Sequence, residues 1–411
     1  MQDIDVIVVG AGLAGLSAAA LVGRRGCSVQ VLEAAGAPGG LARSRRRGGF
    51  IFNRGAHALY RGGAAQSVLQ ELGLPLEGRA PSLDGVVWRG GTSHRLPGTP
   101  WSVLTSSLLS WRGRAALASV FARLPRLTPG DFVDVSAEQW LTHTVRDSEA
   151  RVFLAAMLRL STYAGDLTAV SAEATLTMLQ RAAGSGVLYL DGGWQQLVDG
   201  LRAAAEAAQV ELRYRTPVAS VEPGAVTLRD GTRMQAEYVV VATPPSVCDA
   251  WLPETPVHAA NVACLDVALR VRPEGPGLAF DLDDPMYLSV HSDTARLACK
   301  GGALAHLLHY QPSDDPLQTR AALESLLDRV LPGWREHVEH EQFLPSITVT
   351  EGLVRPGMSL AQRPGIAVPG MPKVWRVGDA VGAHGMLADA ALGSAREVAA
   401  AIARARIPEA A

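Results

Sequence analysis

The 411-residue chain has very little lysine and very little cysteine. Its two lysines are Lys300 and Lys373, so nearly all of its positive charge comes from arginine. A net charge of −2 gives no basic excess of the kind that nucleic-acid binding needs. The four cysteines form no CxxC pair and no Cys/His spacing, which disfavours a zinc site or a disulfide framework and fits a reducing cytosol. They are Cys27, Cys248, Cys264 and Cys299.

Targeting and membrane-spanning signals are also missing. Residues 6–22 are apolar, but Asp3 and Asp5 precede them where a signal peptide carries positive charge. Glycines interrupt this stretch, whereas a membrane span needs about 20 continuous apolar residues. With 48% hydrophobic residues the chain can form a large core. We therefore expect a cytoplasmic protein of two or three domains that binds no metal.

The N-terminal segment has the pattern of a βαβ unit. Residues 5–10 form a β-branched run that is typical of a strand buried on both faces. Residues 13–25 carry helix-forming side chains, and residues 28–32 form a second apolar strand that ends at Glu33. This is the context that a glycine-rich nucleotide-binding turn requires.

Three glycines and one acid in this unit have distinct expected roles. Gly10 permits the tight turn, Gly12 lets the backbone approach a pyrophosphate, and Gly15 lets the helix pack against the strand. Glu33 is placed to accept hydrogen bonds from ribose hydroxyls and would repel a 2′-phosphate. A Rossmann-like turn that binds nothing is the competing interpretation, which the complete βαβ context disfavours.

A second glycine pair, Gly39-Gly40, follows Glu33 in "EAAGAPGGLARS". At this point the sequence resembles the family of FAD-dependent amine oxidases, protoporphyrinogen oxidases and phytoene-desaturase-like dehydrogenases. In that family a Gly-Gly loop runs along the FAD diphosphate towards the flavin. Members often have arginine directly after the glycine pair, whereas this chain has Leu41 there and Arg43 two residues on.

Three later segments strengthen the resemblance. Residues 216–245 are expected to form a strand, a turn at Asp230-Gly231 and a strand, with Val218 contacting adenine. "LDGGWQQLVDGL" (190–201) matches the family's glycine turn into a helix. In residues 374–402, Gly378-Asp379 matches the pair whose acid holds the ribitol chain, and a turn at 385–387 opens a helix to about residue 403.

That last helix would direct its free N–H groups at the flavin N1/O2 edge, where reduced flavin is negative. The FAD contacts that the motifs and the resemblance imply are Gly10, Gly12, Ala14, Gly15, Glu33, Ala34, Gly39, Gly40, Leu41, Arg43, Val218, Gly378, Asp379, Gly385, Met386 and Leu387. No Cys or His lies in an attachment motif, so we expect non-covalent FAD.

The resemblance implies an α/β fold with a discontinuous, glutathione-reductase-type Rossmann-like domain. We expect the FAD-binding domain at 1–75, 188–250 and 346–411, and an α+β substrate domain at 76–187 and 251–345. The first segment of the substrate domain is expected to be mostly helical, with a capping box from Ser136 to Gln139. Its other segment is expected to form strands, in "NVACLDVALRV", "MYLSVHS" and "RLACKGGALAHLLHY", followed by a helix near 320–330. No second glycine-rich βαβ unit offers a nicotinamide site, so oxygen, a quinone or another carrier would reoxidise the flavin.

Two departures from the amine oxidases decide the expected branch. Those enzymes usually keep a lysine bridged by water to flavin N5, and here Leu269 or Arg270 takes its place. They often have a tyrosine at the C-terminal turn, where this chain has Met386. We therefore favour the phytoene-desaturase-like branch, whose members dehydrogenate or isomerise lipophilic skeletons by hydride transfer to flavin N5. An amine or porphyrinogen oxidase, and a flavin protein without turnover, stay as alternatives.

Two histidines are candidate catalytic residues. His57 lies in "FIFNRGAHALYRGG", a segment that returns to the flavin in this family, and Tyr60 follows it. His384 precedes the C-terminal turn. An imidazole with a pKa near 6.5 suits acid or base work. The competing interpretation is packed histidines without chemistry, and hydride transfer needs no protein base if the substrate C–H is activated.

Residues 101–127 mix tryptophan and leucine with four arginines. One interpretation is a membrane-surface helix through which a lipophilic substrate enters the protein. The other, which we favour on the near-neutral charge, is a set of helices that cover the substrate cavity with their arginines in solvent.

Overall fold

A parallel sheet of five strands forms the first layer of the protein. The computed structural model describes residues 4–55, 57–253 and 258–406. The strand order is β10-β2-β1-β14-β20, and every neighbouring pair is parallel. The strands are β1 (Val6–Val9), β2 (Val29–Leu32), β10 (Glu211–Arg213), β14 (Tyr238–Val241) and β20 (Val374–Arg376).

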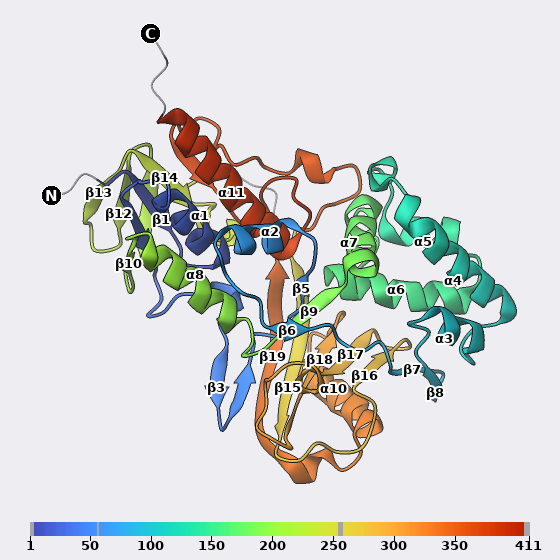
Figure 1. Cartoon of the computed structure of the whole chain (residues 1–411). Coiled ribbons are helices and arrows are strands. Elements are labelled where there is room, and N and C mark those ends of the chain that lie inside the picture. The colour runs from blue at the N-terminus through green and yellow to red at the C-terminus, as the bar shows by residue number, and fades with distance from the viewer. Residues whose placement is uncertain (1–3, 56, 254–257, 407–411) are drawn as a thin grey trace.

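Both faces of this sheet are covered, as its continuous apolar strands require. Val6, Val8 and Val240 pack against the helical layer, whereas Val9 and Val241 pack against a small antiparallel sheet. The helices are α1 (Leu13–Gly23), α2 (Ala64–Glu71), α8 (Gln195–Ala207) and α11 (Leu387–Ala405). The small sheet consists of β11 (Val218–Glu222), β12 (Ala225–Leu228) and β13 (Arg233–Gln235). This three-layer arrangement confirms the expected α/β fold with a Rossmann-like sheet (Figure 1).

A second, seven-stranded sheet carries the rest of the molecule. Its order is β19-β15-β18-β17-β16-β7-β8, and all its pairs are antiparallel except β16 with β7. The strands are β7 (Val86–Arg89), β8 (Thr92–Arg95), β15 (Ala260–Leu269), β16 (Leu278–Asp281), β17 (Met286–Val290), β18 (Ala303–His309) and β19 (Val338–Thr350). Helix α10 (Pro316–Val330) covers one face, and β19 runs from this sheet up to α11 (Figure 1).

A helical lobe and two small sheets complete the fold. The helices of the lobe are α3 (Pro100–Thr105), α4 (Trp111–Arg123), α5 (Ala137–Thr144), α6 (Ser148–Thr162) and α7 (Ala172–Ser185). The short α9 (Pro245–Cys248) follows β14 and packs with the small antiparallel sheet of the first layer. The small sheets pair β3 (Arg45–Arg47) with β4 (Phe50–Phe52), and β5 (Leu59–Tyr60) and β6 (Gly78–Arg79) with β9 (Val187–Leu190). No helix within the described ranges has both the length and the apolar character needed to cross a bilayer.

Local predictions were mostly confirmed, with three corrections. The capping box at Ser136 forms, since its side chain accepts from the Gln139 N–H and the Gln139 side chain accepts in return. Residues 216–245 form four strands, not two, because an extra turn at Gly224, with φ of +81°, creates a hairpin. The strand expected from residue 296 begins at Ala303 instead. The mostly helical first segment also contributes the β7–β8 hairpin, whose turn uses Gly90 and Gly91 at positive φ.

Candidate active site

The two glycine segments lie against each other at the carboxyl end of β1. The Gly39 N–H donates to the Ala11 carbonyl at 2.8 Å, and a Cβ on Gly40 would lie 3.6 Å from the Gly12 Cα. A Cβ on Gly12 would meet nothing within 4 Å, and Gly12 begins α1 without a side-chain cap. The first N–H groups of α1 therefore border open space, which is the donor arrangement that a pyrophosphate needs.

Gly10 and Gly15 are required by the fold itself. Gly10 has φ of +105°, and a Cβ there would lie 2.8 Å from the Ala242 carbonyl oxygen. A Cβ on Gly15 would lie 2.0 Å from the Gly10 carbonyl oxygen. Ala14, between them in the first turn of α1, is buried. These positions fix the strand-to-helix turn, whereas Gly12 leaves room above it.

Glu33 is held at the edge of the same open space. Its Oε2 accepts from the Ala11 N–H at 2.8 Å, and its Oε1 accepts from the Ala35 N–H at 2.8 Å. Each carboxylate oxygen has a second lone pair, so the group can also accept from two hydroxyls. Ala34 is exposed beside it. Val218 opens β11, two residues after Thr216, whose N–H donates to the Glu33 carbonyl at 2.9 Å.

The loop after the glycine pair leaves two side chains on the surface. Residues Gly40–Ala42 form one turn of 3₁₀ helix, and Leu41 is 44% exposed. Arg43 is exposed, and no carboxylate among the described residues pairs with it. A free guanidinium next to an uncapped helix start is consistent with a phosphate partner.

A polar network that the sequence motifs did not indicate fixes this loop. The Asn53 Oδ1 accepts from the Ser44 hydroxyl at 2.7 Å and from the Trp194 N–H at 3.1 Å. The Ser44 Oγ accepts from the Gln195 N–H, and the Gln195 Oε1 accepts from the Ser44 N–H, both at 3.1 Å. These hydrogen bonds thus join the glycine loop to the end of β4 and to the start of α8.

The Gly378-Asp379 pair lies at the end of β20, on the open side of the parallel sheet. A Cβ on Gly378 would meet nothing within 4 Å, although its φ of +155° favours glycine. The Asp379 Oδ2 accepts from the Thr350 hydroxyl at 2.5 Å, which brings the end of β19 to this site. Burial raises the pKa of the Asp379 carboxyl above its usual value.

A buried arginine that sequence reasoning missed organises the turn into α11. The Arg363 guanidinium donates to the carbonyls of Gly382 at 2.5 and 2.9 Å, Gly385 at 2.5 Å and Asp379 at 3.0 Å. Burial lowers the pKa of Arg363 to about 10, so the group stays charged at neutral pH. The side chain wraps the whole segment from Asp379 to Gly385.

The start of α11 is unusual in its backbone. Met386 precedes the helix without a side-chain cap, and Leu387, its first residue, has φ of +56°. A leucine rarely adopts this conformation, and such residues cluster at functional sites. Asp389 in the first turn is buried, accepts from the Ala65 N–H at 2.8 Å and pairs with Arg181. The N–H groups of Asp389 and Ala390 bond to the Met386 carbonyl, which leaves those of Leu387 and Ala388 to face an anionic partner.

The two candidate catalytic histidines have different surroundings. The His57 Nδ1 lies 2.8 Å from the Gly55 carbonyl, and its ring packs edge-on against Trp194 with centroids 4.8 Å apart. Burial lowers the pKa of His57, so its ring is neutral near pH 7. The His384 Nε2 instead lies 2.7 Å from Glu397 on α11. His384 thus has an acidic partner, whereas His57 lies next to the loop that reaches the site.

A buried polar layer under the His57 loop was also missed by sequence reasoning. Asp266 on β15 is fully buried and lies 2.5 Å from the His306 Nδ1 on β18. Its carboxylate also accepts from the Gln342 Nε2 at 2.9 Å and from the Cys264 thiol at 3.1 Å. The same Gln342 amide donates to the Asn53 carbonyl at 2.9 Å, which ties the layer to the loop above.

The wall beyond the start of α11 is apolar and rich in tyrosine. Met386 and Tyr310 belong to one buried apolar cluster, against which Leu387, Tyr60 and Ile347 pack. Five of the seven tyrosines lie close enough to act on one another's pKa or to hydrogen-bond, and burial raises the pKa of each. They are Tyr60, Tyr163, Tyr189, Tyr287 and Tyr310. The Tyr189 and Tyr287 hydroxyls lie 2.8 Å apart. These phenols are therefore uncharged near neutral pH.

Both lysines lie elsewhere. Lys373 pairs with Glu237 at 3.1 Å, and Lys300 is exposed in a turn. Leu269 is buried on the α10 side of the sheet, and Arg270 is exposed and donates to the Glu336 carbonyl at 2.7 Å. In the described part of the chain no group of three or more His, Cys, Asp or Glu side chains is arranged to hold a metal ion.

Comparison with known proteins connects this geometry with a family. Residues 13–264 match the model of the flavin containing amine oxidoreductases. A hydroxyneurosporene desaturase of Cereibacter sphaeroides is 25% identical over 68% of this chain and 67% of its own length. A coproporphyrinogen III oxidase of Propionibacterium freudenreichii is 28% identical over 58% of this chain and 56% of its own length.

The fold has solved counterparts. A putrescine oxidase structure aligns with 98% of this chain and 100% of its own, with a TM-score of 0.74 and 19% identity. At that identity the likeness concerns the fold alone. Together the fold and the matches define an FAD-dependent oxidoreductase. The chain belongs to the flavin containing amine oxidoreductase family. Desaturases and oxidases both occur among its relatives, so the substrate has to be argued from the site.

Proposed function

We propose that this protein binds FAD non-covalently and dehydrogenates a lipophilic, natural-product-like carbon skeleton. The observation that carries the proposal is the apolar, tyrosine-rich wall that continues from the Met386 turn. An apolar wall binds hydrocarbon by removing it from water and offers no counter-charge to an amine. Bound FAD supplies the hydride acceptor, its N5 atom.

The residues present fit this cofactor. The open space over Gly12 and the uncapped start of α1 would accept the pyrophosphate, with Arg43 as a further phosphate donor. The Glu33 carboxylate would bind the ribose hydroxyls, and Asp379 the ribitol hydroxyls. The uncapped start of α11 would place N–H dipoles at the flavin edge that becomes negative on reduction.

The wall around Met386 would orient the substrate. Its buried phenols stay protonated because burial raises their pKa, so they act as hydrogen-bonding and stacking groups and not as bases. A fixed substrate C–H over the acceptor is the main contribution that such a wall makes to the rate.

His57 is the proposed acid–base group. Because burial lowers its pKa, the neutral ring can take up a proton from the substrate as its carbon skeleton changes. The same group would serve a redox-neutral isomerisation, in which a proton moves between two substrate carbons. His57→Gln would then flatten the acid limb of the pH profile of kcat, while His384→Gln would leave it unchanged.

An anaerobic titration of the purified holoenzyme tests the substrate class. An acyclic polyene, a porphyrinogen and a primary amine are each added, and the visible flavin absorption is followed. The proposal predicts bleaching by the polyene and none by the amine. Bleaching by the amine or the porphyrinogen alone, with hydrogen peroxide formed in proportion once air is admitted, would replace it with the oxidase alternative.

The oxidase alternative has one observation in its favour. The coproporphyrinogen oxidase match covers 58% of this chain, so a porphyrinogen is a reasonable second substrate class. Against an amine oxidase, neither Leu269 nor Arg270 directs a cationic side chain into the site. A flavin protein without turnover would bleach with none of the three compounds.

A further inference from the structure

Arg159 on α6 is a partly buried arginine without an acidic partner. Its Nε donates to the Gly165 carbonyl at 3.0 Å, and none of the described Asp and Glu side chains forms an ion pair with it. Burial lowers the pKa of the Arg159 guanidinium. Glu138 and Asp166 act on this guanidinium from beyond ion-pair distance. Its terminal nitrogens therefore stay open, and an anion bound there would recover part of the cost of burying the charge.

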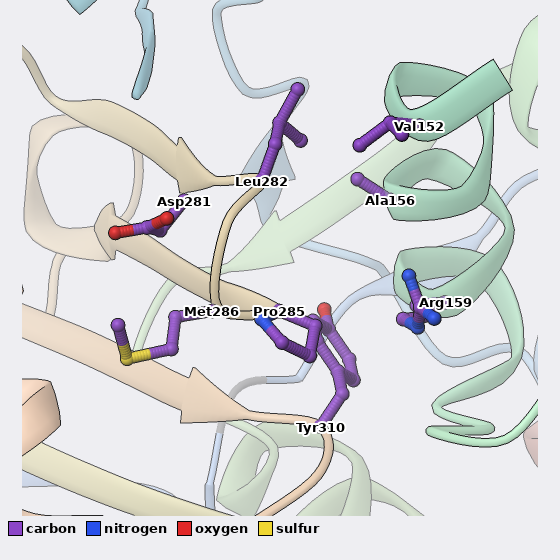
Figure 2. Close-up of a pocket in the computed structure, with 8 residues that line it drawn as sticks. All are labelled: Val152, Ala156, Arg159, Asp281, Leu282, Pro285, Met286 and Tyr310. Atoms are coloured by element: carbon purple, nitrogen blue, oxygen red, sulfur yellow. The ribbon is translucent and has the colours of Figure 1, made fainter. Parts of the chain in front are cut away.

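Arg159 borders a small pocket between α6 and the β16–β17 hairpin (Figure 2). Val152 and Ala156 form the α6 side with it, and Pro285, Met286 and Tyr310 lie opposite. The empty space, including the open mouth, is about 240 Å³. The pocket thus suits a compact polar head on an otherwise apolar ligand.

The Tyr310 hydroxyl adds a second donor to this pocket. Tyr310 is 3% exposed, and its hydroxyl has no hydrogen-bond partner in the described part of the chain. Buried hydroxyls are almost always bonded, so an unbonded one beside a pocket is available to a ligand that enters it. In Figure 2 Tyr310 and Arg159 border the same space.

The acid in the pocket does not compete for Arg159. Asp281 accepts from Arg329 at 2.6 Å and from the N–H groups of Asp283 and Asp284 at 3.0 and 3.1 Å. Its charge is already compensated, and in Figure 2 its carboxylate lies on the far side of the pocket from Arg159.

The pocket adjoins the apolar wall of the active site. Tyr310 belongs to the same buried cluster as Met386, and Tyr60 packs against that cluster. The Tyr60 hydroxyl donates to the Ser161 carbonyl, at the end of α6, at 3.1 Å. Tyr310 therefore links the pocket to this cluster, and we expect the apolar body of a ligand on the side of Tyr310 that faces the cluster.

We propose that Arg159 and Tyr310 form a subsite for the carboxylate of an amphipathic substrate. This inference rests on the proposed function, because it adds an anionic end group to the lipophilic skeleton proposed there. A carboxylate fits better than a neutral oxygen because the two terminal nitrogens of the guanidinium have no hydrogen-bond partner among the described residues and match two carboxylate oxygens.

Calorimetric binding of phenylbutyrate and of phenylbutanol to the purified protein tests the subsite. The two probes share the apolar body and differ in the charged head. A charge-assisted pair of this kind predicts about tenfold tighter binding of the acid. Arg159→Met is expected to remove that preference, and Tyr310→Phe to weaken acid binding about threefold. Arg151→Met removes a charge from the same helix outside the pocket and is expected to leave the preference intact.

The subsite would be overturned by any of three results. These are equal affinity for the acid and the alcohol, no binding of the acid, and an unchanged preference for the acid in Arg159→Met. The flavin content of each sample, read from its absorption, separates this result from the proposed function. A flavin-free sample that still prefers the acid would refute FAD binding and keep the subsite. A flavin-loaded sample without the preference would refute the subsite alone.

Discussion

A methyl group at Gly12 would have room in the protein itself, because nothing lies within 4 Å of its position. The same methyl would occupy the space proposed for the pyrophosphate. This separates Gly12 from Gly10 and Gly15, where a Cβ would collide with backbone and damage the fold. Gly12 is therefore the residue at which we expect a substitution to remove cofactor binding without unfolding the protein.

Gly12→Ala is expected to fold normally and to retain less than about a tenth of the wild-type flavin, since steric exclusion costs more than about 1.4 kcal/mol. Flavin content by absorption and the thermal midpoint of the apoprotein measure the two effects. Gly184→Ala, also in open space but on α7, is the matched control and should keep its flavin. Full flavin content in Gly12→Ala would place the pyrophosphate elsewhere.

Arg363 is expected to be the most sensitive single side chain of the C-terminal turn. Arg363→Met would leave the carbonyls of Asp379, Gly382 and Gly385 without their donor, at a cost of about 3 kcal/mol. The midpoint temperature of thermal unfolding and the flavin content should both fall. Arg376→Met, which removes a bond to the Gly365 carbonyl, is the comparison and should lose less. Equal losses in both variants would argue against a special role for Arg363.

Among the elements, α3 and α4 have features expected from both interpretations of residues 101–127. Leu117 and Val120 on α4 are buried in the core, as helices that cover a cavity require. Trp101 and Trp111 are 69% and 73% exposed, and Arg112 lies 5.2 Å over the Trp111 ring. Residues 101–127 contain four arginines and no acid. This outer face has the composition of a membrane-interface surface.

We expect this face to give weak binding to anionic membranes. In a flotation assay, vesicles containing phosphatidylglycerol should carry part of the wild-type protein, and vesicles of phosphatidylcholine should not. The double variant Trp101→Ser/Trp111→Ser should lose the binding, because each tryptophan contributes about 1.5–3 kcal/mol of apolar burial. Leu317→Ser, an exposed apolar residue on α10, serves as control. Absence of flotation with anionic vesicles would leave only the covering role.

Elements with strong local signals were predictable, and those held by distant partners were not. The expected helix at 13–25 and the final helix after residue 385 correspond to α1 and α11, because glycine turns and periodic apolar residues define them locally. Gly90-Gly91 is a further local signal, from which the β7–β8 hairpin could have been predicted. The roles of Arg363 and Asp266 depend on carbonyls and side chains far away in sequence, which no local pattern reveals.

For the whole molecule, we expect buried histidines to lower stability in acid. Burial lowers the pKa of His291 well below its usual value, and the nearby His306 and His57 rings lower it further. The His291 ring stacks on Tyr189 with centroids 4.0 Å apart and meets His306 edge-on with centroids 4.4 Å apart. The unfolded chain then binds more protons than the folded one below about pH 6.5, so stability falls as the pH falls through that value. The loss approaches about 1.4 kcal/mol per pH unit for this group.

His291→Phe keeps an aromatic ring but cannot be protonated. It should lower stability near pH 8, where the wild-type ring is neutral and well packed. As the pH falls from 7 to 5, the gap between wild type and variant should narrow, because only the wild type is destabilised by protonation of this ring in the unfolded chain. The thermal midpoints of wild type and variant are compared across this pH range. Because the two proteins share all other titratable groups, a pH-dependent difference reports on His291. A gap that stays constant with pH would contradict the assignment.

At this scale the sequence predicted the fold class and the cofactor better than the site. The glycine segments, Glu33 and the Gly378-Asp379 pair lie along one edge of the parallel sheet, which the order of motifs implied. The pocket at Arg159 arises where α6 meets β16 and β17, elements separated by more than a hundred residues. Only the folded chain brings those side chains together.

The central claim is that one FAD lies along the two glycine segments without a covalent bond. The most direct test is the visible spectrum of the purified protein, followed by acid precipitation and identification of the released chromophore. We predict a flavin spectrum and about one FAD per chain in the supernatant, with a colourless pellet. A colourless protein that FAD cannot reconstitute, or a flavin that stays with the pellet, would contradict it.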